Sequence, residues 1–171
     1  MKEELIFQER QRFNQWWNIL LLVLFNGIFI YGCIIQLGMG KPFGNNPMSD
    51  TMLIVVTILV ALITIASIFF IRLDTVINEE GVYERMFPLQ LRFGFTPWDH
   101  VSNVAVKKGL LGKFGGGLGI RYGFRKKAYT VSGNNALQLT LKNNKRIYIG
   151  TQQPEALIEF LDKLDAERKQ K

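Results

Sequence analysis

The sequence predicts a membrane protein of mixed α + β class, in which a two-helix transmembrane hairpin precedes an antiparallel β-barrel or sandwich. Residues 51–71 are 21 consecutive positions without a charge. As a helix they would extend about 30 Å, the thickness of a bilayer's hydrocarbon core. Residues 16–37 have the same apolar character. From residue 72 onward, short alternating segments indicate about seven strands, and a final amphipathic stretch predicts a capping α-helix.

These observations divide the chain of 171 residues into five parts. The expected parts are an interfacial N-terminal segment (1–15), a first transmembrane helix (16–37), an extracytoplasmic loop (38–50), a second transmembrane helix (51–72) and a cytoplasmic β-rich domain (73–171). The spans leave roughly 100 residues for the last part, which is enough for one small domain with its own core.

The N-terminal segment is charged, yet Ile6, Phe13 and Trp17 recur at helical spacing. This spacing predicts a short interfacial helix that brings Trp16 and Trp17 into the headgroup layer, where indole rings are enriched. A frayed cytosolic tail and a cleaved signal peptide are the alternatives. The apolar run that follows is too long for a signal peptide and lacks a small-x-small cleavage site.

Polar residues interrupt the first span, and Asn26 falls near its midplane. An amide in lipid needs a partner, and the second span offers a stripe of small and polar residues at helical spacing. The expected helix–helix contact comprises Asn26, Gly27, Thr57, Ala61, Thr64 and Ser67. A transport path through Asn26 is the alternative, but two spans without an intramembrane charge make poor transport machinery.

The loop at residues 38–50 contains two prolines and a single basic residue, Lys41. More basic residues flank the other ends of the spans, namely Lys2, Arg10 and Arg12 before the first, and Arg72, Arg85 and Arg92 after the second. Because positive charge is retained on the cytoplasmic side, we expect a multi-pass protein of the inner (plasma) membrane with both termini cytoplasmic. Ser49 or Asp50 is the expected N-cap of the second helix.

After Arg72 the pattern changes from helical to strand-like. A turn at 78–81, with a glycine available for a positive φ, predicts a hairpin between segments 73–78 and 82–87. Further strands are expected at 89–93, 101–106, 119–122, 128–132, 136–142 and 146–150.

A closing helix is expected from Pro154 to about Arg168, with Thr151 as its cap and Pro154 in its first turn. Its apolar face should consist of Leu157, Ile158, Leu161 and Leu164. This spacing is typical of an amphipathic helix that covers a core.

The segment 109–119 contains six glycines in 11 positions. Glycine-rich loops can bind phosphate, but Lys107 stands where a P-loop requires its first glycine, and Phe114 stands where it requires Ser or Thr. The dinucleotide fingerprint also fails, because Ile120 occupies the place of its third glycine. We therefore expect a loop between strands.

The sequence contains no recognisable catalytic or metal-binding pattern. His100 is the only histidine, and no spacing places Ser102 or Ser132 beside it as a nucleophile. Cys33, the only cysteine, lies within the first span, which excludes a disulfide framework and a thiolate metal site. We expect no enzymatic activity, no cofactor and no metal.

The net charge of +7 is concentrated in the second half of the chain, where ten basic residues and no acidic one lie between His100 and Pro154. Such segregation indicates an anionic partner. The candidate residues for binding an anionic surface are Lys107, Lys108, Lys113, Arg121, Arg125, Lys126 and Lys127. We expect hairpin geometry to gather them on one edge of the domain, where each charge near an anionic leaflet contributes about 1 kcal/mol. A solvated basic face is the alternative, and the lack of an interleaved aromatic stacking pattern of a known type disfavours nucleic acid.

The order of strands and closing helix behind two spans resembles the bacterial pleckstrin-homology-like domains of small membrane proteins. The likeness to one group of short two-span bacterial proteins runs nearly from end to end. The shared phrases are FQERQRFNQWW (7–17), GKPFGNNPMSD (40–50), GIR (119–121), YTVSGN (129–134) and IGTQQPE (149–155). The resemblance implies a fold and a topology but no activity, and Leu118 stands where similar sequences have tryptophan.

Two functional hypotheses follow. The first is a non-enzymatic, membrane-anchored binding or scaffold module, whose basic pleckstrin-like domain engages anionic lipid headgroups or a membrane protein partner. The second is a structural or accessory subunit of a larger membrane complex, in which the stripe on the second span meets a foreign helix instead of Asn26. Both hypotheses make the lipid bilayer an integral partner.

Overall fold

The computed structural model describes residues 5–12, 15–109, 119–131 and 133–170 of the chain. The chain forms two compact units, each with its own fold. A helical unit contains residues 13–70, and a β unit combines residues 1–12 with residues 71–171. Most of the predicted glycine-rich loop, including Lys113 and Leu118, lies outside the described residues, as does Ser132.

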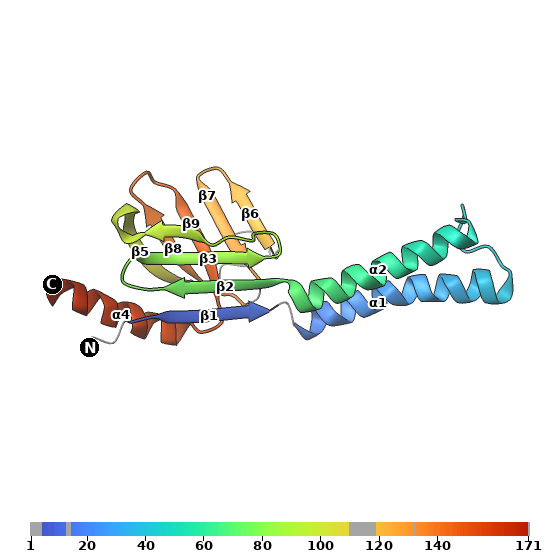
Figure 1. Cartoon of the computed structure of the whole chain (residues 1–171), viewed down its shortest axis with the longest axis horizontal. Helices are drawn as coiled ribbons and strands as arrows, with labels where there is room; N and C mark the ends of the chain where they lie inside the picture. Colours follow the sequence, from blue (N-terminus) through green and yellow to red (C-terminus); the bar gives the residue numbers. More distant parts are fainter. Residues whose placement is uncertain (1–4, 13–14, 110–118, 132, 171) are drawn as a thin grey trace. The chain divides into compact units, whose positions relative to one another are not determined.

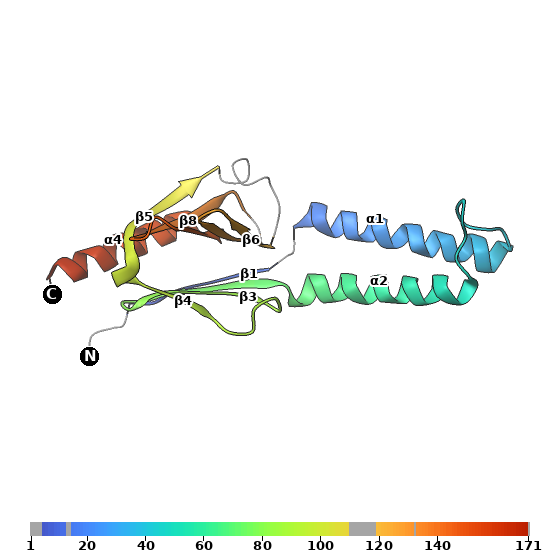
Figure 2. The ribbon, with the colours of Figure 1, turned by 90° about the horizontal axis from the view of Figure 1, so that it is seen from above.

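The helical unit is an antiparallel pair of long apolar helices (Figure 2). Helix α1 (Trp16–Cys33) continues into one π-helical turn, η1 (Ile34–Gly38), and α2 (Asp50–Phe70) returns beside it. Their mean hydropathies are 2.3 and 3.0, and both helices are long enough to cross a membrane. Most of their large apolar side chains are exposed, which is a favourable arrangement in lipid and a costly one in water. The pair therefore indicates association with a membrane.

The first sheet of the β unit has four antiparallel strands in the order β1-β2-β3-β4 (Figure 1). They are β1 (Phe7–Arg12), β2 (Arg72–Ile77), β3 (Gly81–Phe87) and β4 (Gly94–Pro97). The predicted hairpin around residues 78–81 is confirmed, since Ile77 and Val82 are register partners. The strand predicted at 89–93 is wrong, because these residues belong to the loop between β3 and β4.

Strand β1 contradicts the prediction of an N-terminal interfacial helix. Its side chains alternate between buried and exposed with a period of two, as a half-buried strand requires. Phe7, Glu9 and Gln11 are buried, whereas Arg10 and Arg12 are exposed. The helical reading failed because two of the three inward positions carry polar side chains, which hid the alternation.

The buried polar side chains of β1 connect the two sheets. The Glu9 carboxylate accepts hydrogen bonds from the Thr151 hydroxyl and the Gln152 backbone amide, both at 2.7 Å. The Gln11 side-chain amide donates to the Gly150 carbonyl at 2.6 Å. These bonds satisfy groups that would be costly to bury alone, so β1 is an integral part of the β unit.

The second sheet has five strands in the order β5-β8-β9-β7-β6, and its β7–β9 pair is parallel. The strands are β5 (Val101–Lys108), β6 (Gly119–Gly123), β7 (Lys126–Thr130), β8 (Asn135–Leu141) and β9 (Arg146–Thr151), and the short η2 helix (Trp98–His100) joins the sheets. The described residues thus form nine strands in two sheets that do not close into a barrel, rather than about seven antiparallel ones.

The closing helix α4 (Pro154–Gln170) forms as predicted and packs on the core. Leu157, Phe160 and Leu164 are its buried residues, and the Phe160 ring lies 5.7 Å from the ring of Phe7 on β1. Ile158, which was predicted for the core face, is 41% exposed. Thr151 lies in β9 instead of capping the helix directly. Its hydroxyl accepts a hydrogen bond from the backbone amide of Gln153, just before α4 begins.

Candidate binding surfaces

The predicted basic cluster does not assemble on one edge of the domain. Lys107 and Lys108 lie on β5, whereas Arg121, Arg125 and the lysines at 126 and 127 lie on β6, β7 or their turn. Strands β5 and β6 are the opposite edges of the five-stranded sheet. The prediction failed because the strands are not arranged in chain order, which no local pattern reveals.

The structure brings a different set of basic residues together at the end of the sheet where the β6–β7 and β8–β9 turns lie. Lys126 and Arg146 are register partners, and the Arg146 amide donates to the Arg125 carbonyl at 2.9 Å. Phe124, in the same turn as Arg125, is 90% exposed. Arg146 and its neighbours Lys142 and Lys145 were absent from the predicted set, because the parallel β7–β9 pairing that adds them joins segments distant in sequence.

Lys127 is half-buried, and its ammonium contacts aromatic side chains of the β unit. Its ammonium lies 4.7 Å from the centre of the Tyr129 ring, and the Tyr129 hydroxyl donates to the buried Glu84 at 3.2 Å. Burial raises the pKa of Glu84, against the opposing effects of Tyr129 and Lys127. Burial alone would lower the pKa of Lys127, but the contacts with Tyr129 and the nearby Glu84 charge outweigh it and raise the pKa. These groups form an internal polar contact between the sheets.

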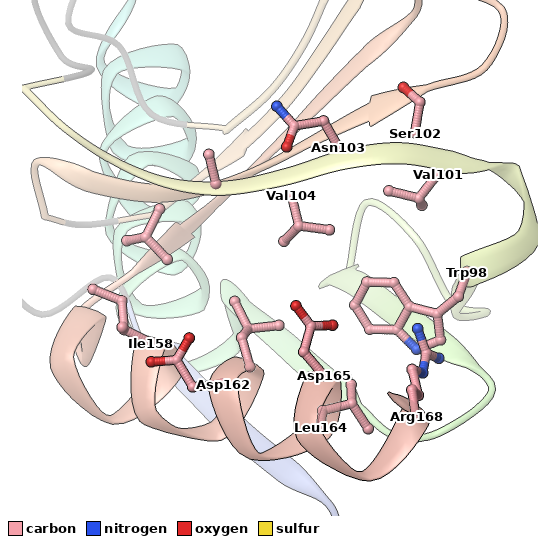
Figure 3. A pocket seen from close by; sticks show the side chains of 13 residues that line it. Trp98, Val101, Ser102, Asn103, Val104, Ile158, Asp162, Leu164, Asp165 and Arg168 are labelled. Atoms are coloured by element: carbon pink, nitrogen blue, oxygen red, sulfur yellow. The ribbon is translucent and has the colours of Figure 1, made fainter. Parts of the chain in front are cut away.

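A groove of about 430 Å³ lies between β5 and α4 (Figure 3). Val104 and neighbouring residues of β5 form one wall, and Ile158, Leu161 and Leu164 contribute apolar surface from the helix. Asp162 and Asp165 line the groove from the same helix and give it an acidic side (Figure 3). The groove therefore combines apolar surface with two carboxylates and, beside Trp98, the guanidinium of Arg168.

Two side-chain contacts show how β5 and α4 run relative to each other, and Trp98 and Arg168 of the second contact also line the groove. At one end the Lys108 ammonium lies 3.9 Å from the Glu155 carboxylate, between two exposed side chains. At the other end the Arg168 guanidinium stacks 4.7 Å from the ring of Trp98, whose indole donates to the Asn78 carbonyl at 2.8 Å. Strand β5 and helix α4 consequently run in opposite directions along the whole groove.

The backbone groups on the edge of β5 that faces away from β8 can form hydrogen bonds with an additional strand. Among the described strands, β5 pairs only with β8. An edge strand presents alternating backbone N–H and C=O groups that an additional extended chain can pair with. The groove thus lies beside a strand edge that can accept such a chain.

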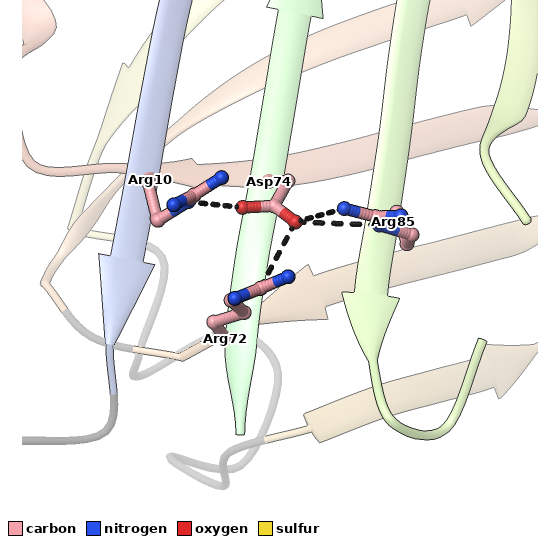
Figure 4. A network of polar contacts seen from close by, with 4 residues as sticks. All are labelled: Arg10, Arg72, Asp74 and Arg85. Carbon is pink, nitrogen blue, oxygen red and sulfur yellow. Dashed lines mark hydrogen bonds and ion pairs between the residues drawn. The ribbon is translucent and has the colours of Figure 1, made fainter. Parts of the chain in front are cut away.

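A charged cluster occupies the outer face of the four-stranded sheet (Figure 4). Asp74 on β2 is surrounded by Arg10 at 2.8 Å, Arg85 at 2.7 Å and Arg72 at 3.3 Å. Burial alone would raise the pKa of Asp74, but the hydrogen bonds from Arg85 and Arg10 outweigh it and hold the pKa below its usual value. The cluster ties three neighbouring positions of the sheet together.

In the helical unit, the predicted contact of Asn26 with the stripe on α2 is present as a hydrogen bond. The Asn26 side-chain amide donates to the Thr64 hydroxyl at 2.7 Å, and Thr57 lies 3.3 Å from the Cys33 sulfur. Ala61 and Ser67 are half-buried on the same face. Gly27 is exposed, and a Cβ placed on it would meet no atom within 4 Å, so the structure does not place it in the predicted helix–helix contact.

The residues weighed for catalysis take structural or exposed positions. His100 is exposed, and its carbonyl accepts the Lys142 amide at 2.9 Å. The Ser102 hydroxyl donates to the Thr140 carbonyl at 3.0 Å. Within the described residues, no group of three or more His, Cys, Asp or Glu side chains could hold a metal ion.

Comparison of the chain with protein-family models, curated proteins and solved structures gave no match. The likeness to pleckstrin-homology-like domains therefore stays a prediction from the sequence. Function has to be argued from the groove, the open strand edge and the distribution of charge.

Proposed function

We propose that this protein is an integral membrane protein whose β unit binds an extended segment of a partner protein in the groove between β5 and α4. The observation that carries the proposal is the groove itself, which lies beside the open edge of β5 and is acidic on its helical side. A bound segment would add a strand to β5 and place alternate side chains against the apolar wall. The role is binding, without catalysis.

The chemistry of the groove specifies the partner. Val104, Ile158 and Leu161 favour apolar side chains on the bound segment, and Asp162 with Asp165 favours a basic one. Strand β5 has eight residues, so a segment of about five to seven extended residues would fit along it. The partner is therefore a protein segment that alternates apolar residues and carries a lysine or arginine.

Membrane anchoring and orientation complete the proposal. Two apolar helices of spanning length support insertion, and the predominance of basic residues on the β unit, compared with Lys41 alone in the loop, supports a cytoplasmic β unit. The pleckstrin-homology-like assignment stays a prediction from the sequence, because the structure shares with it only the coarse order of β-sheets followed by a C-terminal helix. The version of this function that relies on anionic headgroups alone is weakened, because its basic residues occupy opposite sheet edges.

The accessory-subunit hypothesis loses the feature that favoured it. The stripe on α2 was expected to meet a foreign helix, but Thr64 and Thr57 contact Asn26 and Cys33 of the same chain. Groups that are already satisfied within the hairpin have little to gain from an external helix.

The proposal can be tested by selecting ligands from a random heptapeptide library displayed on phage. The target is the full-length chain in lipid nanodiscs, because the β unit includes residues on both sides of the spans. We expect enriched peptides to alternate apolar residues and to include a basic one, and to slow amide hydrogen exchange in β5. The double variant Asp162→Asn with Asp165→Asn should bind them about tenfold more weakly.

The matched control is Glu159→Gln with Glu167→Gln, which removes the same charge from the same helix outside the groove. It should leave binding unchanged. Peptides that bind both double variants equally, without protecting β5, would overturn the proposal.

A further inference from the structure

One end of the four-stranded sheet is the place where the chain leaves for the apolar helices. Its last row of register partners is Arg12, Arg72 and Phe87. The chain continues from Arg12 toward α1 and arrives at Arg72 from α2. From Phe87 it continues into the loop of residues 88–93, which leads to β4. Three segments therefore emerge from the same end of the sheet.

The loop at this end exposes apolar side chains. Leu89 is 66% exposed, Leu91 is 72% exposed and Phe93 is 41% exposed. The loop is nonetheless ordered against the sheet, because the Gln90 amide donates to the Met86 carbonyl at 2.7 Å. Single exposed leucines are ordinary on soluble domains, but three large apolar residues within one six-residue loop form a local apolar surface.

Arginines lie at the same end of the sheet as this apolar surface. Arg92 belongs to the loop, Arg12 and Arg72 belong to the last row of the sheet, and Arg85 stacks 4.3 Å from the ring of Phe93. Among the described residues, Asp74 is the acidic side chain that forms ion pairs with this group, and Arg10 also contacts it. Apolar residues flanked by arginines are typical of surfaces that lie in the interface of an anionic bilayer.

Chain length fixes where this end of the sheet must be if α2 crosses the membrane. Only Ile71 separates the end of α2 from the start of β2, and one residue extends at most about 3.6 Å. Aromatic residues mark the same termini of the helices, with Trp16 and Trp17 at the start of α1 and Phe70 at the end of α2. Such residues are enriched where a span meets the headgroups.

From these observations we infer that the loop of residues 88–93 is an interfacial anchor. Leu89 and Leu91 insert into the boundary between headgroups and acyl chains, while Arg12, Arg72 and Arg92 contact lipid phosphates. The occupant of this surface is the bilayer that the protein's own helices cross, so the inference rests on the membrane insertion proposed above. Two chain connections already link the β unit to the apolar helices. The anchor adds a third point of attachment to the membrane, and it thereby fixes the orientation of the β unit.

The test places an environment-sensitive fluorophore on the full-length chain in nanodiscs that contain phosphatidylglycerol. Cys33→Ser removes the only native cysteine, and Leu91→Cys supplies the labelling position. We expect the label to emit as in an apolar medium and to be quenched by lipids that carry a spin label near the glycerol backbone. Asn143→Cys, in the exposed turn between β8 and β9, is the matched control and should be quenched little.

A third labelling position separates this inference from the membrane insertion on which it rests. Leu62→Cys, which is exposed on α2, should be quenched by lipids with a spin label deep in the acyl chain. Quenching at position 62 without quenching at 91 would overturn the anchor while membrane insertion stands. No quenching at 62 would overturn both.

A second measurement keeps the inference testable if the label itself draws the loop into lipid. In the unlabelled chain in nanodiscs, Leu89→Ser with Leu91→Ser should increase proteolytic cleavage of the loop. In isolated peptides with the sequence of the loop, studied without detergent, the same two substitutions should not increase cleavage. Cleavage that is unchanged in nanodiscs would contradict the anchor.

Discussion

Asp74 is one carboxylate among three arginines whose positive charges would otherwise repel one another. Arg10, Arg72 and Arg85 lie within 3.3 Å of it, on β1, β2 and β3. The Asp74 side chain is 7% exposed, so the three contacts replace nearly all of its hydration. Because charged hydrogen bonds contribute more than neutral ones, this residue should matter for the stability of the whole sheet.

Replacing Asp74 with Asn should destabilise the β unit by about 1–2 kcal/mol at pH 7, since partly exposed arginines keep some solvation when the charge is lost. The pKa of Asp74 is lower in the folded state than its usual value of 3.8. Its contribution is therefore fully present above that value and is lost as the pH falls through the folded-state pKa. The difference between the wild type and Asp74→Asn should disappear in strongly acidic solution.

The measurement is denaturant unfolding of the full chain in detergent, followed by Trp98 fluorescence in a background where Trp16 and Trp17 are Phe. The control is Asp99→Asn, an exposed aspartate in η2 that should leave stability unchanged. A difference that grows on acidification would contradict the assigned direction of the pKa shift.

At the scale of elements, the sequence predicted correctly most of the helices and strands that have a clear local periodicity. The helices were predicted well because long apolar runs have few alternative structures, and the bond between Asn26 and Thr64 followed from helical spacing. Strand β1 was missed because Glu9 and Gln11 are buried by contacts with β9 and the residue after it, which are 139 or more residues away. No local pattern can indicate such a partner.

The helix pairing itself makes a prediction. The Cys33 sulfur lies 3.3 Å from the Thr57 hydroxyl, so Thr57→Cys should form a disulfide with Cys33 on mild oxidation. After cleavage at a protease site placed in the loop between the helices, the two fragments should migrate together without reductant and apart with it. Ile58→Cys, one residue further on, is 54% exposed and should not crosslink.

Crosslinking at position 58 but not at 57 would mean that the face of α2 turned toward α1 is different from the one described. Equal crosslinking at both positions would indicate a loosely packed pair. A disulfide at position 57 and none at position 58 is the result that agrees with the hydrogen bond between Asn26 and Thr64.

At the scale of the whole molecule, the candidate site depends on strand order, which the sequence did not reveal. The strands nearest to the candidate basic residues were predicted approximately, but β5 and β6 lie at opposite edges of their sheet. The groove was missed for a related reason, because it exists only where α4 lies along β5. Both features join segments that are distant in sequence, and the parallel β7–β9 pair cannot be deduced from alternation.

The same topology predicts that a very short turn can replace the helical unit and leave the β unit folded. Arg12 and Arg72 are register partners on neighbouring antiparallel strands, whose Cα atoms are about 5 Å apart in such pairs. A two-residue Asn-Gly turn can join strands at this distance. A chain of residues 5–12, Asn-Gly and residues 72–171 should therefore fold as a soluble monomer with dispersed amide NMR signals.

Residues 72–171 alone should fail this test, because the edge of β2 loses its partner strand and the buried groups that contact β1 lose theirs. The Thr151 hydroxyl and the Gln152 amide would be left without Glu9, and for the buried Thr151 hydroxyl the loss of its acceptor costs about 1–3 kcal/mol. The joined chain carrying Glu9→Ala should fall between the two, since it keeps the strand but loses these bonds. If the joined chain aggregates as readily as residues 72–171, β1 does not belong to the domain core, and the register that places Arg12 beside Arg72 is wrong.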